Sequence, residues 1–171
     1  LTDSSVSCWG ANDYGQIGDG TTTFRTNTPT AASLPAGSVV TDLSTGNYHN
    51  CATLSDSSVY CWGSSEHGQI GDGDTTHRTT PTQITVHSGT TTTQVVTGAY
   101  FTCAVQSDNK LYCWGQNYAG IFGDGTTDSS PSPVHVNTLP SGKQISDVTS
   151  GAGTISICVL LDDYLVSCWG Y

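Results

Sequence analysis

The tripeptide Cys-Trp-Gly occurs four times in the chain, and this repetition constrains the fold more than any other feature. The copies lie 53, 52 and 55 residues apart and begin at Cys8, Cys61, Cys113 and Cys168. In the first three copies an Asp-Gly pair starts eleven residues after the cysteine, at 19–20, 72–73 and 124–125. A period near 50 residues is typical of propellers and similar arrays, in which each repeat contacts its neighbours. The sequence therefore predicts that residues 1–171 form one repeat array.

Each period contains four short runs with the composition of β-strands. In the second repeat these runs are DLSTG, NCATLSD, SVYCWG and PTQITV. They are rich in Val, Thr, Tyr and Trp, and turn residues separate them. Four consecutive antiparallel strands make one propeller blade. We predict an all-β fold of propeller blades with four antiparallel strands each, in about three repeats of ~53 residues.

The period also divides the chain into four segments. Residues 1–34 are expected to hold the end of a blade, namely the first Cys-Trp-Gly strand and the strand after it. Residues 35–87 and 88–139 are expected to be complete repeats, and residues 140–171 an incomplete one. Asp3 falls at a hairpin apex, so the segment is expected to start inside a hairpin. We expect further repeats of the same polypeptide, or other copies of this chain, to complete the array.

Six of the seven cysteines form pairs ten residues apart: Cys51 with Cys61, Cys103 with Cys113, and Cys158 with Cys168. Residues at this spacing face each other across a hairpin whose midpoint is five residues from each. The midpoints are Asp56, Asp108 and Asp163. Asp is a turn-forming residue, and zinc sites favour the closer C-x(2–4)-C spacing, so the pattern favours cross-strand disulfides. Each should contribute about 2.5–3 kcal/mol to stability.

Cys8 is left without a partner at this spacing. We predict that it is unpaired, or that it bonds to a segment outside this sequence. Three disulfides require an oxidising compartment, so the chain is predicted to be extracellular or at the cell surface.

The tryptophan of each Cys-Trp-Gly copy is predicted to pack in the blade core. It follows the cysteine directly, so its side chain lies on the opposite face of the strand, where a large ring can fill the space between neighbouring blades. The glycine after it allows a close approach of the backbone. The four predicted core residues are Trp9, Trp62, Trp114 and Trp169.

The strings C-W-G-x-N-x-x-G-Q-I-G-D-G-T-T, R-T-x-T-P and G-x-Y-H-N-C-A-T-L-S-D resemble the repeats of the regulator of chromosome condensation family, in a secreted, Cys-containing form. The resemblance covers essentially the whole chain, because the motif recurs in phase three times. It implies a β-propeller, usually of seven blades, so this chain would be a partial or open propeller or an excerpt of a seven-bladed one. Functions in the family include guanine nucleotide exchange with chromatin docking, β-lactamase inhibition and light sensing through tryptophans.

The charge of the chain argues against a nucleic-acid partner and against the chromatin role. Its formal net charge is -10. The basic residues are Arg25, Arg78, Lys110 and Lys143. Binding to phosphates needs clustered cations. No run approaches the roughly 18 apolar residues of a membrane span, so we predict no membrane insertion.

No pattern of residues indicates catalysis, a metal or a cofactor, and we predict that the chain is not an enzyme. The string GDGDTT at 71–76 resembles part of a calcium loop, but Thr82 or Gln83 stands where such a loop has its final Glu. A turn is therefore favoured there, with a weak calcium site as the alternative. No G-x-S-x-G elbow occurs. His49 is predicted to be a packed core residue rather than a ligand.

Several Ser/Thr-rich segments, some near proline, are candidate O-glycan acceptors, with plain solvated loops as the alternative. The candidate residues are Thr21, Thr22, Thr90, Thr91, Thr92, Thr93, Ser130 and Ser132.

From the sequence we predict an extracellular structural or assembly unit, a disulfide-reinforced propeller segment that could belong to a surface appendage or fibre. The alternative is a secreted module that binds a protein or a glycan, as an inhibitor-like propeller would. In that case the loops HSGTTTTQ and TTTFRTNT would make the contacts. Aromatic anchors normally dominate such surfaces, and Phe24 is the single aromatic residue in these two loops.

Overall fold

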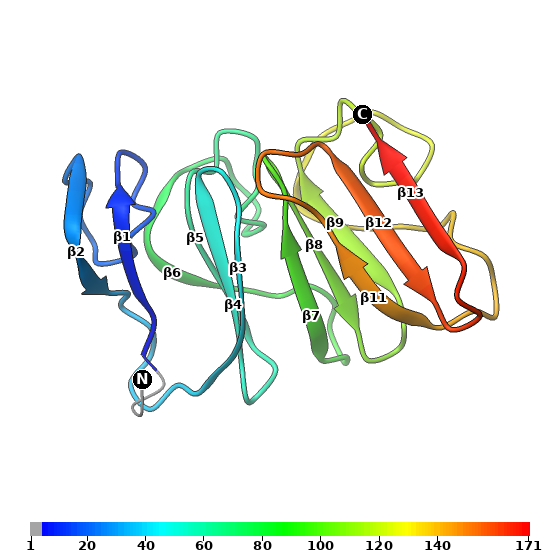
Figure 1. Ribbon diagram of the computed structural model, residues 1–171, viewed down its shortest axis with the longest axis horizontal. Coiled ribbons are helices and arrows are strands. Elements are labelled where there is room, and N and C mark those ends of the chain that lie inside the picture. Colours follow the sequence, from blue (N-terminus) through cyan, green and yellow to red (C-terminus); the bar gives the residue numbers. More distant parts are fainter. Residues whose placement is uncertain (1–4) are drawn as a thin grey trace.

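The computed structural model describes residues 5–171, in which thirteen strands form four antiparallel sheets (Figure 1). The first sheet contains β1 (Ser7–Ala11) and β2 (Arg25–Ala31). The second contains β3 (Val40–Thr45), β4 (His49–Leu54), β5 (Val59–Gly63) and β6 (Arg78–Ile84). The third contains β7 (Thr92–Thr97), β8 (Phe101–Gln106), β9 (Leu111–Gly115) and β10 (Ser130–His135). The fourth contains β11 (Ile145–Thr149), β12 (Ser156–Leu161) and β13 (Val166–Gly170).

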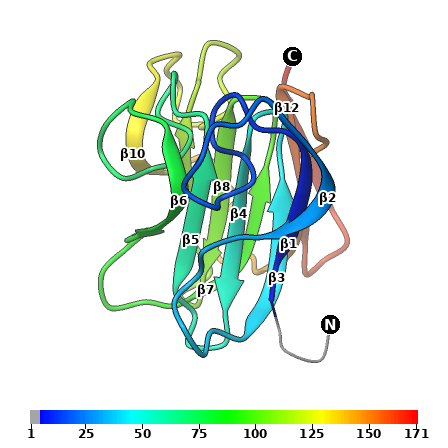
Figure 2. The ribbon, with the colours of Figure 1, turned by 90° about the vertical axis from the view of Figure 1, so that its left-hand side faces the viewer.

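The sheets stand side by side in chain order as propeller blades and do not close into a ring (Figure 1). Figure 2 looks along this row from the first sheet. The all-β prediction of four-stranded antiparallel blades in a partial propeller is confirmed. Each sheet falls inside one of the predicted segments, whose boundaries stay predictions, and Asp3 lies outside the described residues. Within residues 5–171 no helix is long and apolar enough to span a membrane.

The hairpins that join the second and third strands of a blade turn around the predicted aspartates. In the second sheet, Asp56 Oδ1 accepts hydrogen bonds from the amide of Ser58 at 3.0 Å and from its hydroxyl at 2.6 Å. The residue after each aspartate is left-handed: φ is 66° at Ser57, 65° at Asn109 and 66° at Tyr164. A three-residue loop that ends in this conformation is a common hairpin connection, so local turn chemistry fixes the register.

This register places the paired cysteines directly opposite each other, and all three predicted disulfides are present, each with 4.1 Å between Cα atoms. They lie in different surroundings. Cys51–Cys61 and Cys103–Cys113 are fully buried, whereas Cys168 is exposed and Cys158 is half-buried. Cys8 is half-buried and forms no disulfide among the described residues.

Each covered tryptophan is held by a loop of the preceding repeat. The indole nitrogen of Trp62 donates to the carbonyl of Gln16 at 2.9 Å, that of Trp114 to Gln69 at 3.0 Å, and that of Trp169 to Ile121 at 2.7 Å. Gly71, at φ +92°, lies so close that a Cβ would stand 2.4 Å from Trp114 Nε1. Trp62 and Trp114 are completely buried, and Trp169 is half-buried. The tryptophans therefore link one blade to the next, as predicted for Trp62, Trp114 and Trp169.

The prediction that Trp9 belongs to the blade core is wrong for the part of the chain that the structure describes. Its side chain is 64% exposed. Its strand position is the same as that of the other three, but no loop within residues 5–171 covers its indole. The burial of this residue type thus depends on a neighbouring repeat and not on its own strand.

Candidate functional site

The connections between strands fall into two groups that lie at opposite ends of the blades (Figure 1). We call one end the loop face; it is formed by residues 12–24, 46–48, 64–77, 98–100, 116–129 and 150–155. We call the other the hairpin face; it is formed by residues 32–39, 55–58, 85–91, 107–110, 136–144 and 162–165. Loops carry binding residues more often than the scaffold beneath them does, so each face is a candidate site.

A row of aromatic side chains crosses the loop face from the first sheet to the third. The ring of Tyr14 contacts that of Tyr48, with 5.6 Å between centroids, and Tyr48 stacks on Tyr100 at 5.8 Å. His77 lies 5.0 Å from Tyr14, and His67 lies 5.2 Å from Tyr100. We call these five residues the aromatic row. Tyr48 is 37% exposed and the others are half-buried, so each member of the row is at least partly open to solvent.

None of these five residues is among the binding residues predicted from the sequence. The members of the row come from loops that are far apart in the chain, and each loop contributes only one or two rings. A signal was present in the repeat alignment: Tyr48 and Tyr100 both stand two residues after the glycine that ends the first strand of a repeat, and Tyr14 aligns with His67. The predicted binding loops HSGTTTTQ and TTTFRTNT contain none of these residues.

Two exposed carboxylates adjoin the aromatic row in sequence. The exposed Asp13 precedes Tyr14, and the exposed Glu66 precedes His67. Partial burial, the neighbouring Tyr48 and then Tyr118 and Glu66 raise the pKa of the Tyr100 hydroxyl above its usual value. Tyr118 is 55% exposed and adds a further ring beside the row.

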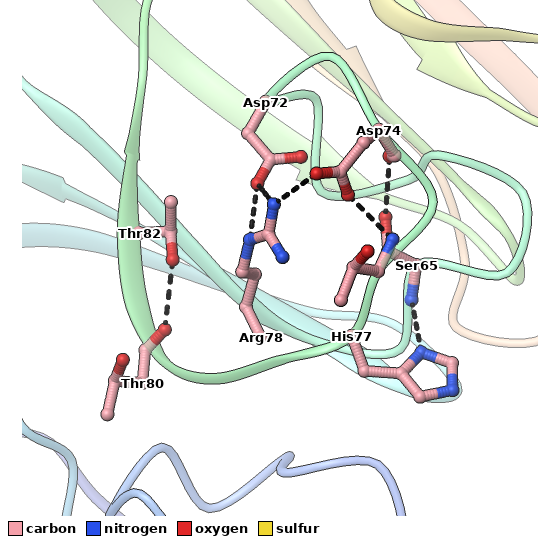
Figure 3. Close-up of polar contacts among 8 residues, drawn as sticks. Ser65, Asp72, Asp74, His77, Arg78, Thr80 and Thr82 are labelled. Carbon is pink, nitrogen blue, oxygen red and sulfur yellow. Dashed lines mark hydrogen bonds and ion pairs between the residues drawn. The ribbon is translucent and has the colours of Figure 1, made fainter.

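In the GDGDTT turn, where a weak calcium site is the alternative prediction, Arg78 binds the two aspartates (Figure 3). Its guanidinium binds Asp72 Oδ2 and, at 2.8 Å, Asp74 Oδ2. The backbone amide of Thr76 also donates to Asp74 at 2.7 Å; this bond and then the Arg78 contact lower the pKa of Asp74. The two carboxylates thus share the positive charge of Arg78, the first residue of the strand that follows the loop. Across residues 5–171 no group of three or more His, Cys, Asp or Glu side chains could hold a metal ion.

The long loops of this face are stiffened by side chains that hydrogen-bond to the backbone. Asn12 accepts from the amide of Ile17 at 2.9 Å and donates to the carbonyl of Thr21 at 3.1 Å. Asn117 repeats the arrangement with Phe122 at 2.8 Å. In the second repeat, where Ser65 replaces this asparagine, the amide of Ser65 donates to His77 Nδ1 at 3.0 Å (Figure 3). His77 is thereby held at the end of the aromatic row.

His49 lies beneath the loop face as a buried residue, with 1% of its surface exposed. Its Nε2 forms a hydrogen bond of 2.9 Å with the hydroxyl of Thr102 on the next blade. Burial removes water from the ring and lowers the pKa of His49 to about 4, against a weaker opposing effect of the Phe101 backbone. His49 is therefore neutral near pH 7, and its position agrees with a core role.

The structure contradicts one of the candidate glycan acceptors. Thr92 is 7% exposed and its hydroxyl accepts from Gln106 Nε2 at 2.8 Å, so it is unavailable to a sugar. Thr92 begins β7, and it is buried while the next residue, Thr93, is exposed. Exposed candidates are Thr21, Thr22, Thr91, Thr93 and Ser132, and Thr90 and Ser130 are half-buried.

A cleft of about 340 Å³ opens between β1 and the second sheet, lined by Cys8, Trp9, Ile17, Leu43 and Asn47 among others. A second cleft, of about 370 Å³, lies at the hairpin face between the third and fourth sheets. Lys110 and Lys143 line it, but Lys110 binds Asp108 at 2.7 Å and Lys143 binds Asp163 at 2.6 Å. The lysines of this face are therefore already paired.

The chain matches the regulator of chromosome condensation (RCC1) repeat over residues 3–53, 56–105 and 108–158. It is 32% identical to the ultraviolet-B receptor UVR8 of Arabidopsis thaliana over 153 residues, which are 89% of this chain and 34% of the receptor. It is 29% identical to the human E3 ubiquitin-protein ligase HERC2 over 150 residues, which are 88% of this chain and 3% of the ligase.

Solved structures show the same fold at lower identity. Human WBSCR16 superposes with a TM-score of 0.83 at 22% identity and covers 98% of this chain and 43% of its own. Yeast RCC1 (Prp20), in its complex with Kap60, superposes with a TM-score of 0.82 at 22% identity and covers 98% of this chain and 40% of its own. The chain therefore spans less than half the length of each of these four proteins.

Proposed function

The chain belongs to the regulator of chromosome condensation (RCC1) repeat family, and we propose that it is a protein-binding propeller segment whose contact surface is the loop face. The observation that carries this proposal is the aromatic row. Tyrosine is enriched in protein interfaces because it supplies a large, stiff contact area together with a hydroxyl that can hydrogen-bond. Here Tyr48 contacts both Tyr14 and Tyr100, so rings from three successive sheets form one continuous surface on the loop face.

The fold of the relatives agrees with this role. Propellers of this family present loops on a rigid scaffold, and yeast Prp20p has been studied for its binding to Gsp1p and histones. Disulfides within the blades would suit an oxidising, extracellular or cell-surface setting, and we include that location in the proposal.

A capture experiment with paired variants tests the proposal. The chain, a Tyr48→Leu/Tyr100→Leu variant and a hairpin-face variant, Asp56→Asn/Asp162→Asn, are immobilised and exposed to the secreted and surface proteins of the source cells. A partner retained in stoichiometric amount by the first and third proteins, but lost with the tyrosine variant, supports the proposal. Equal retention by all three would exclude the loop face as the contact surface.

A second candidate function is that of a structural or assembly unit, and the exposed Trp9 beside the free Cys8 favours it. Further repeats of the polypeptide or other copies of the chain would cover Trp9 as the loops at Gln16 and Gln69 cover Trp62 and Trp114, and such units could build a fibre. Non-reducing electrophoresis and mass photometry test this role. Concentration-dependent oligomers that Trp9→Ser abolishes would support it, and a monomer at all concentrations would exclude self-assembly.

A further inference from the structure

The loop face carries a marked excess of negative charge. The segments that form it contain seven carboxylates, and the arginines Arg25 and Arg78 lie at its border, on the first residues of β2 and β6. The carboxylates are Asp13, Asp19, Glu66, Asp72, Asp74, Asp124 and Asp128. Even with both arginines set against them, five negative charges remain. The hairpin face is closer to neutral, because both lysines of the chain lie on it and bind aspartates there.

Part of the remaining negative charge adjoins the aromatic row. The guanidinium of Arg78 binds Asp72 and Asp74. Asp13 and Glu66 directly precede two members of the row, Tyr14 and His67, and are exposed. Among the described side chains, neither takes part in an ion pair. Asp13 and Glu66 are thus exposed carboxylates, next to the rings in sequence, that could attract a cationic partner.

We propose that the aromatic row binds a positively charged, arginine-containing segment of a partner protein. This inference rests on the proposed function and specifies its partner. A guanidinium group stacks on aromatic rings and also donates paired hydrogen bonds to carboxylates, so it uses both features of the surface. The rings of Tyr14, Tyr48 and Tyr100 follow one another at 5.6 and 5.8 Å, which suits an extended segment that crosses them.

Other occupants use the surface less completely. An apolar segment would cover Asp13 and Glu66 without a counter-charge, and burying an unpaired carboxylate is costly. A neutral glycan could stack on the rings but would gain nothing from the surrounding charge. The net charge of -10 would also speed the encounter with a cationic segment, through attraction that salt weakens.

Selection from a library of displayed random 12-residue peptides tests the inference on the intact chain. The expected result is enrichment of peptides with two or more arginines and net positive charge, which bind at least about tenfold more weakly to the Asp13→Asn/Glu66→Gln variant. These two exposed positions should tolerate the change, so the variant should fold. The control, Asp56→Asn/Asp162→Asn, removes the same charge from the hairpin face and should change binding by less than about twofold.

The outcomes separate the inference from the function on which it rests. Enriched peptides that lack excess positive charge, but lose binding when Tyr48 and Tyr100 become leucine, would overturn the inference and leave a protein-binding loop face intact. Peptides that bind all variants equally, or that weaken equally with the hairpin-face control, would overturn both. In the expected case, replacing arginine by lysine in the best peptide lowers affinity, and replacing it by glutamate abolishes binding.

Discussion

The two faces of this partial propeller are built from the same repeats but by different means. At the hairpin face the β-hairpin turns are closed by local contacts, as where Asp56 binds Ser58, and the two lysines pair with aspartates of their own blade. At the loop face the important contacts cross from one repeat to another, as where Tyr48 stacks on Tyr100 or Trp114 binds the carbonyl of Gln69. The difference indicates that contacts at the hairpin face set the geometry of each blade. Contacts at the loop face join neighbouring blades and bring the aromatic residues of different repeats together.

The largest effect on stability is expected when an indole that a loop covers is removed. Trp114→Ala should destabilise the chain by about 3–5 kcal/mol, because it empties a completely buried site and leaves the Gln69 carbonyl without its donor. Trp9→Ala is the same substitution at an exposed site and should lower the free energy of unfolding by less than about 1 kcal/mol. Urea unfolding measures both; equal losses would show that the covering loop does not determine the contribution of the tryptophan.

The second test uses pH. His49 is neutral in the folded chain because its pKa is lowered from 6.5 to about 4, so the unfolded chain binds more protons between these values. Stability should therefore fall as pH drops from about 6.5 to about 4, by at most about 3 kcal/mol, and change little from this source below pH 4. His49→Phe, which copies Phe101 of the next repeat, should remove that part of the slope. An unchanged acid slope in chemical unfolding of the variant would contradict the prediction.

A third test concerns the hairpin at Asn109, which reaches the next blade. Asn109 donates to the carbonyl of Lys143 at 2.8 Å and accepts from the amide of Ile145 at 2.7 Å. Asn109→Gly tolerates the left-handed backbone conformation but removes both side-chain hydrogen bonds. It should lower the free energy of unfolding by about 1–2 kcal/mol. Ser57→Gly, at a φ of 66°, is the matched control and should be close to neutral. A similar loss in both variants, measured by thermal unfolding, would place the cost in the turn and not in the link between blades.

The smallest change in stability is expected at the centre of the aromatic row. Tyr48→Leu removes a partly exposed ring contact with Tyr14 and Tyr100 and should cost about 0.5–1 kcal/mol. If the row serves binding, this modest loss should accompany a large loss of partner affinity. A destabilisation as large as that of Trp114→Ala would instead assign the row to the structure of the blades.

Much of the fold was predictable because its determinants are local. Cysteines ten residues apart with an aspartate midway fix strand, turn and partner within one hairpin, and the repeat then supplies the blade. Trp62 and Trp114 were also predictable, since every repeat in the middle of an array has a neighbour. Trp9 was not, because its burial requires the loop of a preceding repeat, and no residue within 5–171 supplies one.

The candidate site was harder to predict for the same reason. No single loop contains enough aromatic residues to indicate a surface, and the row exists only because adjacent blades bring Tyr14, Tyr48 and Tyr100 together. The partner of GDGDTT was likewise hidden. Nothing in the spacing of Asp72 and Asp74 distinguishes a metal loop from one closed by Arg78, which lies on the following strand.

The hold of each loop on the indole of the following repeat runs in one direction only along the chain. A lesion in the 64–77 loop should therefore loosen the blade that carries Trp114 before it loosens its own. Local unfolding would then pass from blade to blade toward the C-terminus, because each loop stabilises the blade that follows it. Such an array unfolds in a preferred direction. Hydrogen-exchange rates measured for each blade would show this direction.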